Sequence, residues 1–288
     1  MTQNDSNLNR RALGGRVALI TGANTGIGRV TARELFKQGA HVFIACRSPE
    51  RTRDALHEIQ SFGGDGRIEL LPLDLGDFES IRRCAEAFLA RGLPLHLLIN
   101  NAGLAGTRGV SKSGFEVAFG VNHIGHFLLT QILLERVKSS APARIVTVAS
   151  RAHYRATGIN WSALREPTKT STGLAEYGVS KLANVLFSAE LGRRLHGSGV
   201  QTYSLHPGVV ASDVWRSVPQ PIRALVKLFM ISTEEGAATT LYCAGSPAVA
   251  VETGLYYDQC RVRTASALGR DTALADELWR RSEGWVSG

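Results

Sequence analysis

The sequence predicts a Rossmann-type α/β fold, in which a doubly wound sheet of seven parallel strands carries helices on both faces within a single domain. The main observation is an alternation through all 288 residues: short apolar runs rich in β-branched side chains are followed by helical patterns, as in repeated βαβ units. The second is that the first apolar run, Val17-Ala18-Leu19-Ile20, leads directly into a glycine-rich turn and then a helical pattern. Helices on both faces follow because parallel sheets are buried on both sides.

Seven short runs are expected as strands, with full-length helices between them. The strands should cover residues 16–21, 41–45, 68–73, 95–100, 144–149, 201–205 and 254–258. Gly39 and Gly197, which follow helical patterns, are typical of helix ends. Two irregular stretches, 152–176 and 209–232, follow strand ends, where open α/β sheets bind their ligands. We therefore expect one domain over residues 14–288, with a substrate lid at about 209–232.

The composition and charge limit the class of partner. Hydrophobic residues make up 44% of the chain and charged residues 20%, which is typical of a globular protein and excludes an intrinsically disordered one. The net charge of +8 makes nucleic acid, an anionic membrane surface and an anionic small molecule all candidate partners. The basic residues are scattered as pairs within helical patterns that also contain acids. This pattern favours solvated helix faces and a phosphate-rich cofactor over nucleic-acid binding.

The cysteines and the chain ends indicate a compartment. Four cysteines lie far apart with no CxxC pair, so we expect no metal site and no disulfide framework. Residues 1–13 are polar and are expected to form a flexible tail without a cleavable signal. No apolar stretch approaches the roughly 18–20 residues that a transmembrane helix requires. These features predict a cytoplasmic protein.

The glycine-rich turn has the spacing TGxxxGxG over residues 21–28. Its glycines allow a tight turn, close approach of the backbone to a pyrophosphate, and close helix packing, while the helix N-terminus offers free N–H groups. A tight βα connection without a ligand is the alternative, but strand, turn and helix occur in the required order. No Gly-Lys-Ser or Gly-Lys-Thr follows, which excludes a Walker-type loop. The predicted cofactor contacts here are Gly22, Asn24, Thr25, Gly26, Ile27 and Gly28.

The end of the second expected strand indicates which nicotinamide cofactor is used. An Asp or Glu at this point binds the ribose 2′-hydroxyl, whereas an Arg accommodates a 2′-phosphate. Here the strand is followed by Cys46-Arg47-Ser48, and no acid occurs before Glu50. Arg47 can pair with a phosphate and Ser48 can donate a hydrogen bond beside it. NADP(H) is therefore preferred over NAD(H), although an exposed arginine at a helix start is the alternative for Arg47.

Tyr177 and Lys181 lie four residues apart in a helical pattern, so they share one helix face. Hydride transfer to a carbonyl leaves an alkoxide that needs a proton, and a nearby ammonium lowers the pKa of a phenol toward neutrality. Alone, such a pair is common on helix surfaces. Ser150 ends the expected strand 144–149 and can donate to a substrate oxygen. A serine that merely starts a loop is the alternative.

Together these motifs resemble those of the short-chain dehydrogenase/reductase family, over nearly the whole chain. Residues 21–28 are similar to its TGxxxGxG loop, and Asn100-Asn101-Ala102-Gly103 matches its NNAG motif. The resemblance implies that Tyr177 is the general acid/base, that Ser150 holds the substrate oxygen, and that Lys181 binds the nicotinamide ribose and depresses the tyrosine pKa. It implies that Asn122 holds a water that passes protons through Lys181. Further implied cofactor contacts are Asp74, Leu75, Asn101, Ala102, Gly103, Pro207, Gly208 and Val209.

Finer similarity points to the retinol dehydrogenase and WW-domain oxidoreductase branch. The runs that carry it are residues 45–47, 120–127, 205–210 and 254–257. We expect neither an N-terminal anchor nor a WW module, and the chain departs from the branch in having Ala149 for a common serine and Ser212 where many relatives have threonine. The resemblance implies NADP(H) and a lipophilic aldehyde, ketone or alcohol, and suggests a homo-dimer or homo-tetramer. A retinoid and a bacterial-type ketoreductase substrate both remain open.

Other features have competing interpretations. His123, His126, His153 and His206 show no metal-ligand spacing and are expected to be structural or to line the pocket. Ser150, His206 and Asp213 resemble a hydrolase triad only superficially, because the strand end lacks a GxSxG elbow. The apolar stretch 214–230 suits a substrate lid, a membrane-surface helix or a subunit contact, and its position favours the lid.

Two classes of function fit the sequence. The first is an NADP(H)-dependent oxidoreductase that interconverts a lipophilic carbonyl compound and its alcohol. The alternative is a non-catalytic NADPH-binding scaffold or sensor. The filled positions of the family's catalytic tetrad, Asn122, Ser150, Tyr177 and Lys181, favour the enzyme.

Overall fold

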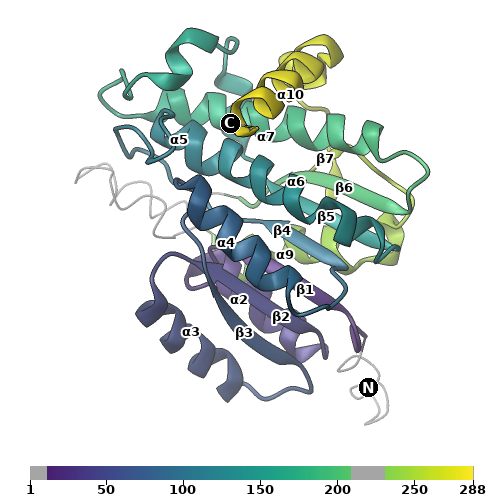
Figure 1. The fold of residues 1–288 in the computed structure, drawn as a ribbon. Coiled ribbons are helices and arrows are strands. Elements are labelled where there is room, and N and C mark those ends of the chain that lie inside the picture. The colour runs from purple at the N-terminus through teal and green to yellow at the C-terminus, as the bar shows by residue number, and fades with distance from the viewer. Residues whose placement is uncertain (1–11, 209–230, 288) are drawn as a thin grey trace.

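The computed structural model describes residues 12–208 and 231–287, which contain one eight-stranded sheet covered by helices (Figure 1). The strand order is β3-β2-β1-β4-β5-β6-β7-β8. The order therefore reverses between β1 and β4, which is where doubly wound sheets bind their ligands. The strands are β1 Val17–Thr21, β2 His41–Cys46, β3 Arg67–Pro72, β4 Leu97–Asn100, β5 Ala143–Val148, β6 Val200–His206, β7 Leu255–Asp258 and β8 Arg261–Val262.

Strands β1 to β7 pair in parallel, which confirms the expected Rossmann-type architecture. The expectation of seven strands was one short. The short β8 pairs antiparallel to β7, with Asp258 opposite Arg261. Gln259 and Cys260 form the two-residue connection, and both have positive φ, 53° and 57°. Such a hairpin normally signals itself through Asn-Gly or Asp-Gly, and this chain has neither at that point.

Helices cover both faces of the sheet because alternate residues of a central strand point to opposite sides. In β1, Val17 and Leu19 enter one apolar cluster, with α4, α6, α7 and α10, while Ala18 and Ile20 enter the other, with α2, α3 and α9. The helices are α2 Gly26–Lys37, α3 Pro49–Ser61, α4 Phe78–Leu89, α5 Val117–Phe119, α6 Gly125–Lys138, α7 Leu174–Arg194, α9 Thr233–Gly245 and α10 Thr272–Val286.

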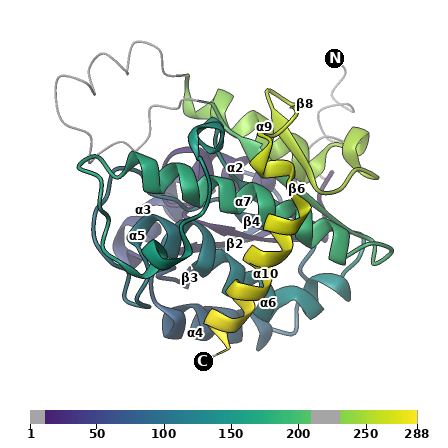
Figure 2. The same cartoon turned by 90° about the horizontal axis from the view of Figure 1, so that it is seen from above.

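Helix α7 is enclosed on two sides, by the sheet and by α10, the last helix of the chain, which crosses it (Figure 2). The Trp279 ring stacks on Phe187 of α7 at a centroid distance of 5.9 Å and meets Phe127 of α6 edge-on at 5.1 Å. Aromatic packing of this kind adds about 0.5–1.5 kcal/mol per pair beyond area burial. The C-terminal helix therefore holds α6 and α7 against each other.

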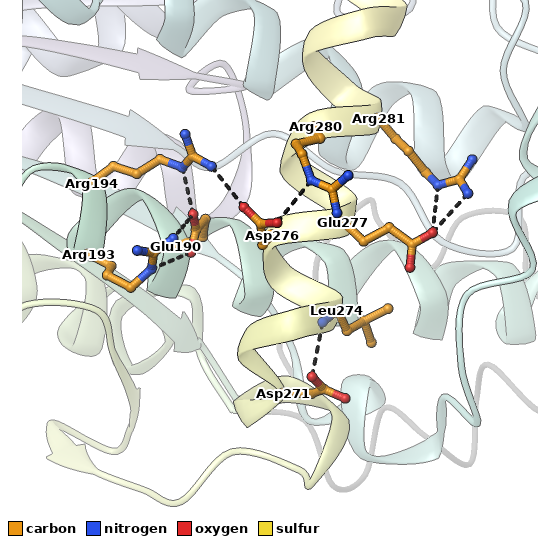
Figure 3. Close-up of polar contacts among 9 residues, drawn as sticks. All are labelled: Glu190, Arg193, Arg194, Asp271, Leu274, Asp276, Glu277, Arg280 and Arg281. Atoms are coloured by element: carbon orange, nitrogen blue, oxygen red, sulfur yellow. Dashed lines mark hydrogen bonds and ion pairs between the residues drawn. The ribbon is translucent and has the colours of Figure 1, made fainter.

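Ion pairs join the C-terminal end of α7 to the N-terminal half of α10 (Figure 3). The buried Glu190 carboxylate pairs with Arg193 and Arg194, at 2.5 and 2.6 Å. Arg194 also reaches Asp276 of α10 at 3.2 Å, and its guanidinium lies 4.5 Å from the Trp279 ring centroid. Arg194 thus serves both helices through a charge contact and a cation–π contact.

The continuous helical stretch Val117–Lys138 includes α5, the π-helical turn Gly120–Ile124 and α6. By length and composition this stretch could cross a membrane, although the sequence predicts no apolar segment long enough for a transmembrane helix. In the structure 72% of its apolar window is buried. Its apolar surface is therefore already used in packing against neighbouring elements.

Candidate active site

One cavity of about 840 Å³ lies at the carboxyl ends of the strands. It brings together nearly all the cofactor and catalytic residues that the sequence singles out, from segments as distant as Gly22 and Gly208. Val209 and most of the expected lid lie outside the described residues, as do Asp213 and residues 214–230. Of the predicted residues, those lining the cavity are Gly22, Asn24, Thr25, Gly26, Ile27, Gly28, Arg47, Ser48, Asp74, Leu75, Asn101, Ala102, Gly103, Ser150, Tyr177, Lys181, Pro207 and Gly208.

The glycine-rich turn forms a cradle that side chains would fill. Gly22 has φ of +66°, and a Cβ on it would lie 2.8 Å from the Ala102 Cβ. A Cβ on Gly28 would lie 2.5 Å from the Asn101 Nδ2 atom. The first turn of α2 contains no acidic residue, and Thr25 makes no side-chain cap, so its N–H groups remain available to an anion. These features fit the pyrophosphate of a dinucleotide.

Thr21, at the end of β1, ties the cradle to the NNAG motif. Its Oγ1 accepts hydrogen bonds from the backbone N–H groups of Asn101 and Ala102, at 3.0 and 2.9 Å. The Asn101 side chain donates in return to the Thr21 carbonyl at 2.8 Å. The two loops that flank the β1/β4 switch point therefore form one rigid unit, as a preorganised ligand site requires.

Arg47 and Ser48 lie at one end of the cavity, at the end of β2. The Arg47 side chain is exposed, and within residues 12–208 and 231–287 no ion pair or hydrogen bond engages its guanidinium. Ser48 makes no side-chain cap for α3, so its hydroxyl is also available. At the neighbouring strand end, one Asp74 carboxylate oxygen accepts the Gly76 N–H at 2.9 Å.

Tyr177, Ser150 and Lys181 meet at the other end of the cavity. The Lys181 Nζ lies 5.6 Å from the centroid of the Tyr177 ring and donates to the Val148 carbonyl at 2.8 Å. Both side chains are carried by the first turns of α7, and Ser150 follows β5 directly. The spacing of four residues thus places phenol and ammonium on one helix face, as predicted.

Burial dominates the electrostatics of this group. It raises the pKa of Tyr177, while a hydrogen bond with the Ser150 side chain lowers it. It lowers the pKa of Lys181 from 10.5 to about 7. The depression of the tyrosine pKa by Lys181, which the resemblance implies, stays a prediction; in the protein without cofactor, burial and then the Ser150 hydrogen bond shift the pKa of Tyr177.

Asn122 is fully buried behind the cavity, where it connects three segments. Its Oδ1 accepts the Leu104 N–H at 2.9 Å, and its Nδ2 donates to the Leu104 carbonyl at 3.0 Å and to Ser180 Oγ at 2.9 Å. A Cβ on Gly103 would lie 3.4 Å from both Asn122 Oδ1 and Lys181 Nζ. The fourth tetrad residue therefore lies beside the lysine but does not line the cavity.

The cavity also contains residues that sequence reasoning did not assign. Val110 and Leu174 are large apolar side chains, 44% and 39% exposed, at its wall. Val110 lies in an irregular segment and Leu174 is the first residue of α7, so neither position has a periodic signal that marks it as cavity lining. Further unassigned lining residues are Leu104, Thr107, Lys112, Val117, Val121, Arg151 and Arg155, whereas His206 lines the cavity as one of the two roles expected for it.

The four histidines are buried, in agreement with a structural or pocket-lining role. His153 accepts the Ser266 N–H through Nε2 at 3.1 Å, and its Nδ1 donates to the Ser150 carbonyl at 2.7 Å. Within the described ranges, 12–208 and 231–287, no group of three His, Cys, Asp or Glu residues is arranged to hold a metal ion.

Comparisons with known proteins give a consistent result. The profile of the short chain dehydrogenase family matches residues 16–222. Retinol dehydrogenase 11 from Mus musculus is 45% identical over 270 residues, which cover 93% of this chain and 85% of the relative. Retinol dehydrogenase 12 from Homo sapiens is 45% identical over 94% of this chain and 86% of its own length. The WW domain-containing oxidoreductase from Danio rerio is 39% identical over 96% of this chain and 69% of its own length.

Solved structures agree with the fold. The crystal structure of an uncharacterized protein from Mycobacterium paratuberculosis superposes with a TM-score of 0.76 at 32% identity, covering 96% of this chain and 94% of that one. The Pseudomonas aeruginosa RhlG/NADP active-site complex gives a TM-score of 0.68 at 30% identity, covering 86% of this chain and 96% of that one.

Proposed function

This chain belongs to the short chain dehydrogenase family, in its retinol dehydrogenase branch, and from that premise we propose that it uses NADP(H) to interconvert a lipophilic carbonyl compound and its alcohol through Tyr177. An oxidoreductase that acts on CH–OH or C=O groups with a nicotinamide cofactor follows from the family itself. The preference for NADP(H), the catalytic roles and the lipophilic substrate are the proposal. The observation that carries it is that Tyr177, Ser150 and Lys181 line the same cavity as the glycine cradle and Arg47.

Arg47 supports NADP(H). A guanidinium without a protein partner among the described residues can form a bidentate pair with a 2′-phosphate, and Ser48 can donate to the same group. The end of β2 has no carboxylate to bind a 2′-hydroxyl. We expect Arg47→Asp to weaken NADPH binding far more than NADH binding, as measured by titration of protein fluorescence. Arg83→Asp, the same charge reversal on α4 outside the cavity, is the control, and equal losses for both cofactors with Arg47→Asp would refute this role.

In the proposed mechanism the cradle residues 22–28, Arg47 and residues 101–103 would hold the cofactor, and Lys181 would hold its ribose. When bound, the nicotinamide would supply or accept the hydride. Ser150 donates a hydrogen bond to the substrate oxygen, and Tyr177 gives that oxygen its proton during reduction or removes it during oxidation. The Lys181 ammonium stabilises the resulting phenolate, and Asn122 supports the route by which a water-borne proton reaches Lys181.

The lipophilic substrate is supported by the apolar wall of the cavity. Val110 and Leu174 are exposed although they are large and apolar, and Val117 and Val121 belong to the same lining. Exposed apolar surface that lines a cavity is typical of a binding site for apolar groups. Leu174→Ser should therefore raise the KM of a long-chain aldehyde more than that of a short one. A uniform change in KM along the series would count against an apolar substrate.

The decisive test is turnover of aliphatic, retinoid, steroid and quinone carbonyls with NADPH and with NADH. Tyr177→Phe should abolish turnover while preserving cofactor binding, because only the phenol hydroxyl, the proposed acid/base, is removed. Tyr242→Phe on α9, on the opposite face of the sheet, is the matched control and should keep full activity. A wild-type protein that binds NADPH but turns over no carbonyl would support the scaffold function instead.

Location and assembly remain predictions. The cytoplasmic location is checked by fractionation of the cells that express the chain. The homo-dimer or homo-tetramer is checked by light scattering of the purified protein.

A further inference from the structure

His126 connects the cofactor cradle to the backbone of Asn122. It lies on α6, four residues after Asn122, and its side chain is almost completely buried. Its Nδ1 lies 3.0 Å from the Asn122 carbonyl oxygen, and its Nε2 lies 2.8 Å from the Thr21 Oγ1. The imidazole therefore joins its own helical stretch to Thr21, which precedes His126 by 105 residues.

The hydrogen bonds fix which tautomer is present. A carbonyl oxygen can only accept, so Nδ1 must carry the proton and Nε2 must be the acceptor. Nε2 then receives the Thr21 hydroxyl proton, whose other acceptor, the Ile99 carbonyl, is farther away at 3.5 Å. Burial lowers the pKa of His126 to about 4, which keeps the ring neutral. The result is a directional chain from the N–H groups of Asn101 and Ala102 through Thr21 and His126 to the Asn122 carbonyl.

The position of the Asn122 backbone matters because Asn122 lies within the π-helical turn Gly120–Ile124. Such turns are rare and commonly occur at functional sites, where they change the direction of backbone groups. The Asn122 side chain is held from one side by Leu104 and Ser180. His126 holds the backbone from the other side, and it ties that backbone to the strand end from which the cradle starts.

We propose that His126 is a positioning residue for hydride transfer, which sets Asn122 relative to the cofactor cradle by donating from Nδ1 to the Asn122 carbonyl and accepting from Thr21 at Nε2. This role rests on the proposed function. His126 touches neither cofactor nor substrate, so its loss should affect the rate and its pH dependence more than cofactor binding. Its donor occupies one lone pair of the Asn122 carbonyl and leaves the second for a water.

Three variants separate the two hydrogen bonds. His126→Phe keeps a ring but removes both. His126→Asn keeps an amide donor near the Nδ1 position, so it can still reach the Asn122 carbonyl. His123→Phe is the matched control, because His123 is on the same helical stretch and equally buried, yet contacts Ser282 of α10 at 3.3 Å instead of the cradle.

Kinetics of correctly folded protein give the first measurement. His126→Phe should lower kcat by about tenfold or more, as expected for a misplaced group at a reaction centre, and should shift the pH profile of kcat, with the Kd for NADPH changed less than about threefold. His126→Asn should recover most of kcat. His123→Phe should lose thermal stability with kcat and its pH profile unchanged. Equal kcat losses in both Phe variants, or an unchanged pH profile in His126→Phe, would overturn the proposal.

Hydrogen exchange provides a measurement that does not depend on turnover. If His126 positions Asn122, the amide of Leu104, which donates to Asn122 Oδ1, should exchange faster in His126→Phe and not in His123→Phe. A wild type without carbonyl turnover but with this exchange pattern would refute the proposed function and leave the positioning intact. Unchanged exchange at Leu104 would refute the positioning even in an active enzyme.

Discussion

Replacing Lys181 with methionine should stabilise the protein while abolishing its activity. Burial lowers the pKa of Lys181 from 10.5 to about 7, so the folded state disfavours the ammonium. A shift of about 3.5 units corresponds to at most about 5 kcal/mol at about 1.4 kcal/mol per unit. The loss of the hydrogen bond to the Val148 carbonyl offsets part of this, although Asn184 Nδ2 still donates to that oxygen at 3.2 Å. We expect a net gain of about 3 kcal/mol in the free energy of unfolding at pH 7 without cofactor.

The pH dependence follows from the same pKa values. Between pH 7 and 10.5 the unfolded chain binds a proton that the folded chain has released, so wild-type stability rises with pH. Methionine does not titrate, so the advantage of Lys181→Met is full at or below pH 7 and disappears toward pH 10.5. Urea unfolding followed by tryptophan fluorescence at pH 7, 8.5 and 10 measures this difference. Lys138→Met, at a half-exposed lysine, is the control and should show no such trend.

A Lys181→Met variant that is less stable than the wild type at pH 7 would refute this reasoning. So would a stability difference that is the same at pH 7 and pH 10. Either result would mean that water or a protein group stabilises the buried ammonium.

Three further predictions concern the framework of the site. Gly125→Ala should destabilise the fold by about 1–3 kcal/mol in thermal unfolding, because its Cβ would lie 2.3 Å from the Leu75 carbonyl, whereas Gly245→Ala, with open space around it, should not. Lowering the pH from 6.5 to about 4 should destabilise the protein by up to about 4 kcal/mol per pH unit. Burial lowers the pKa of His123 to about 3 and the pKa values of His126 and His206 to about 4, so in this range only the unfolded chain takes up these three protons. Urea unfolding midpoints that stay equal at pH 7 and pH 5 would contradict this. The double variant Arg193→Met/Arg194→Met should lose about 3 kcal/mol of unfolding free energy in urea, because it leaves the buried Glu190 without its partners. Adding Glu190→Gln should restore more than half of that free energy. No restoration would show that the loss arises from Trp279 packing instead (Figure 3).

The parts of the fold that the sequence predicts are those with a local signal. The strands show themselves as apolar runs, Gly39 and Gly197 mark the ends of two helices, and the structure confirms seven of eight strands to within about two residues. The eighth depends on Gln259 and Cys260 adopting positive φ, which these residue types do not announce. The cradle is predictable for a similar reason, because only glycine satisfies the close approaches at Gly22 and Gly28.

The residues that form the walls of the site have no such local signal in the sequence. Val110 lies in an irregular segment and Leu174 at the first residue of α7, and their place in the cavity depends on contacts between parts of the chain far apart in sequence. The C-terminal helix α10 is a clear amphipathic pattern, but its packing of Trp279 against Phe187 and Phe127 requires the tertiary structure. Sequence periodicity shows that a helix has an apolar face, not which neighbour covers it.

Lys181 and His126 show why only part of such a site can be predicted from the sequence. Both are polar groups whose charged forms are disfavoured by burial, and sequence alone gives a histidine on a buried helix no function, since no metal or charge-relay spacing accompanies it. The structure gives His126 two specific partners, and each partner belongs to a loop or helix that bears on the cavity. A buried group that lowers stability over part of the pH range, and whose hydrogen-bond partners line one cavity or hold residues that line it, is better explained by the geometry of that cavity than by the stability of the fold.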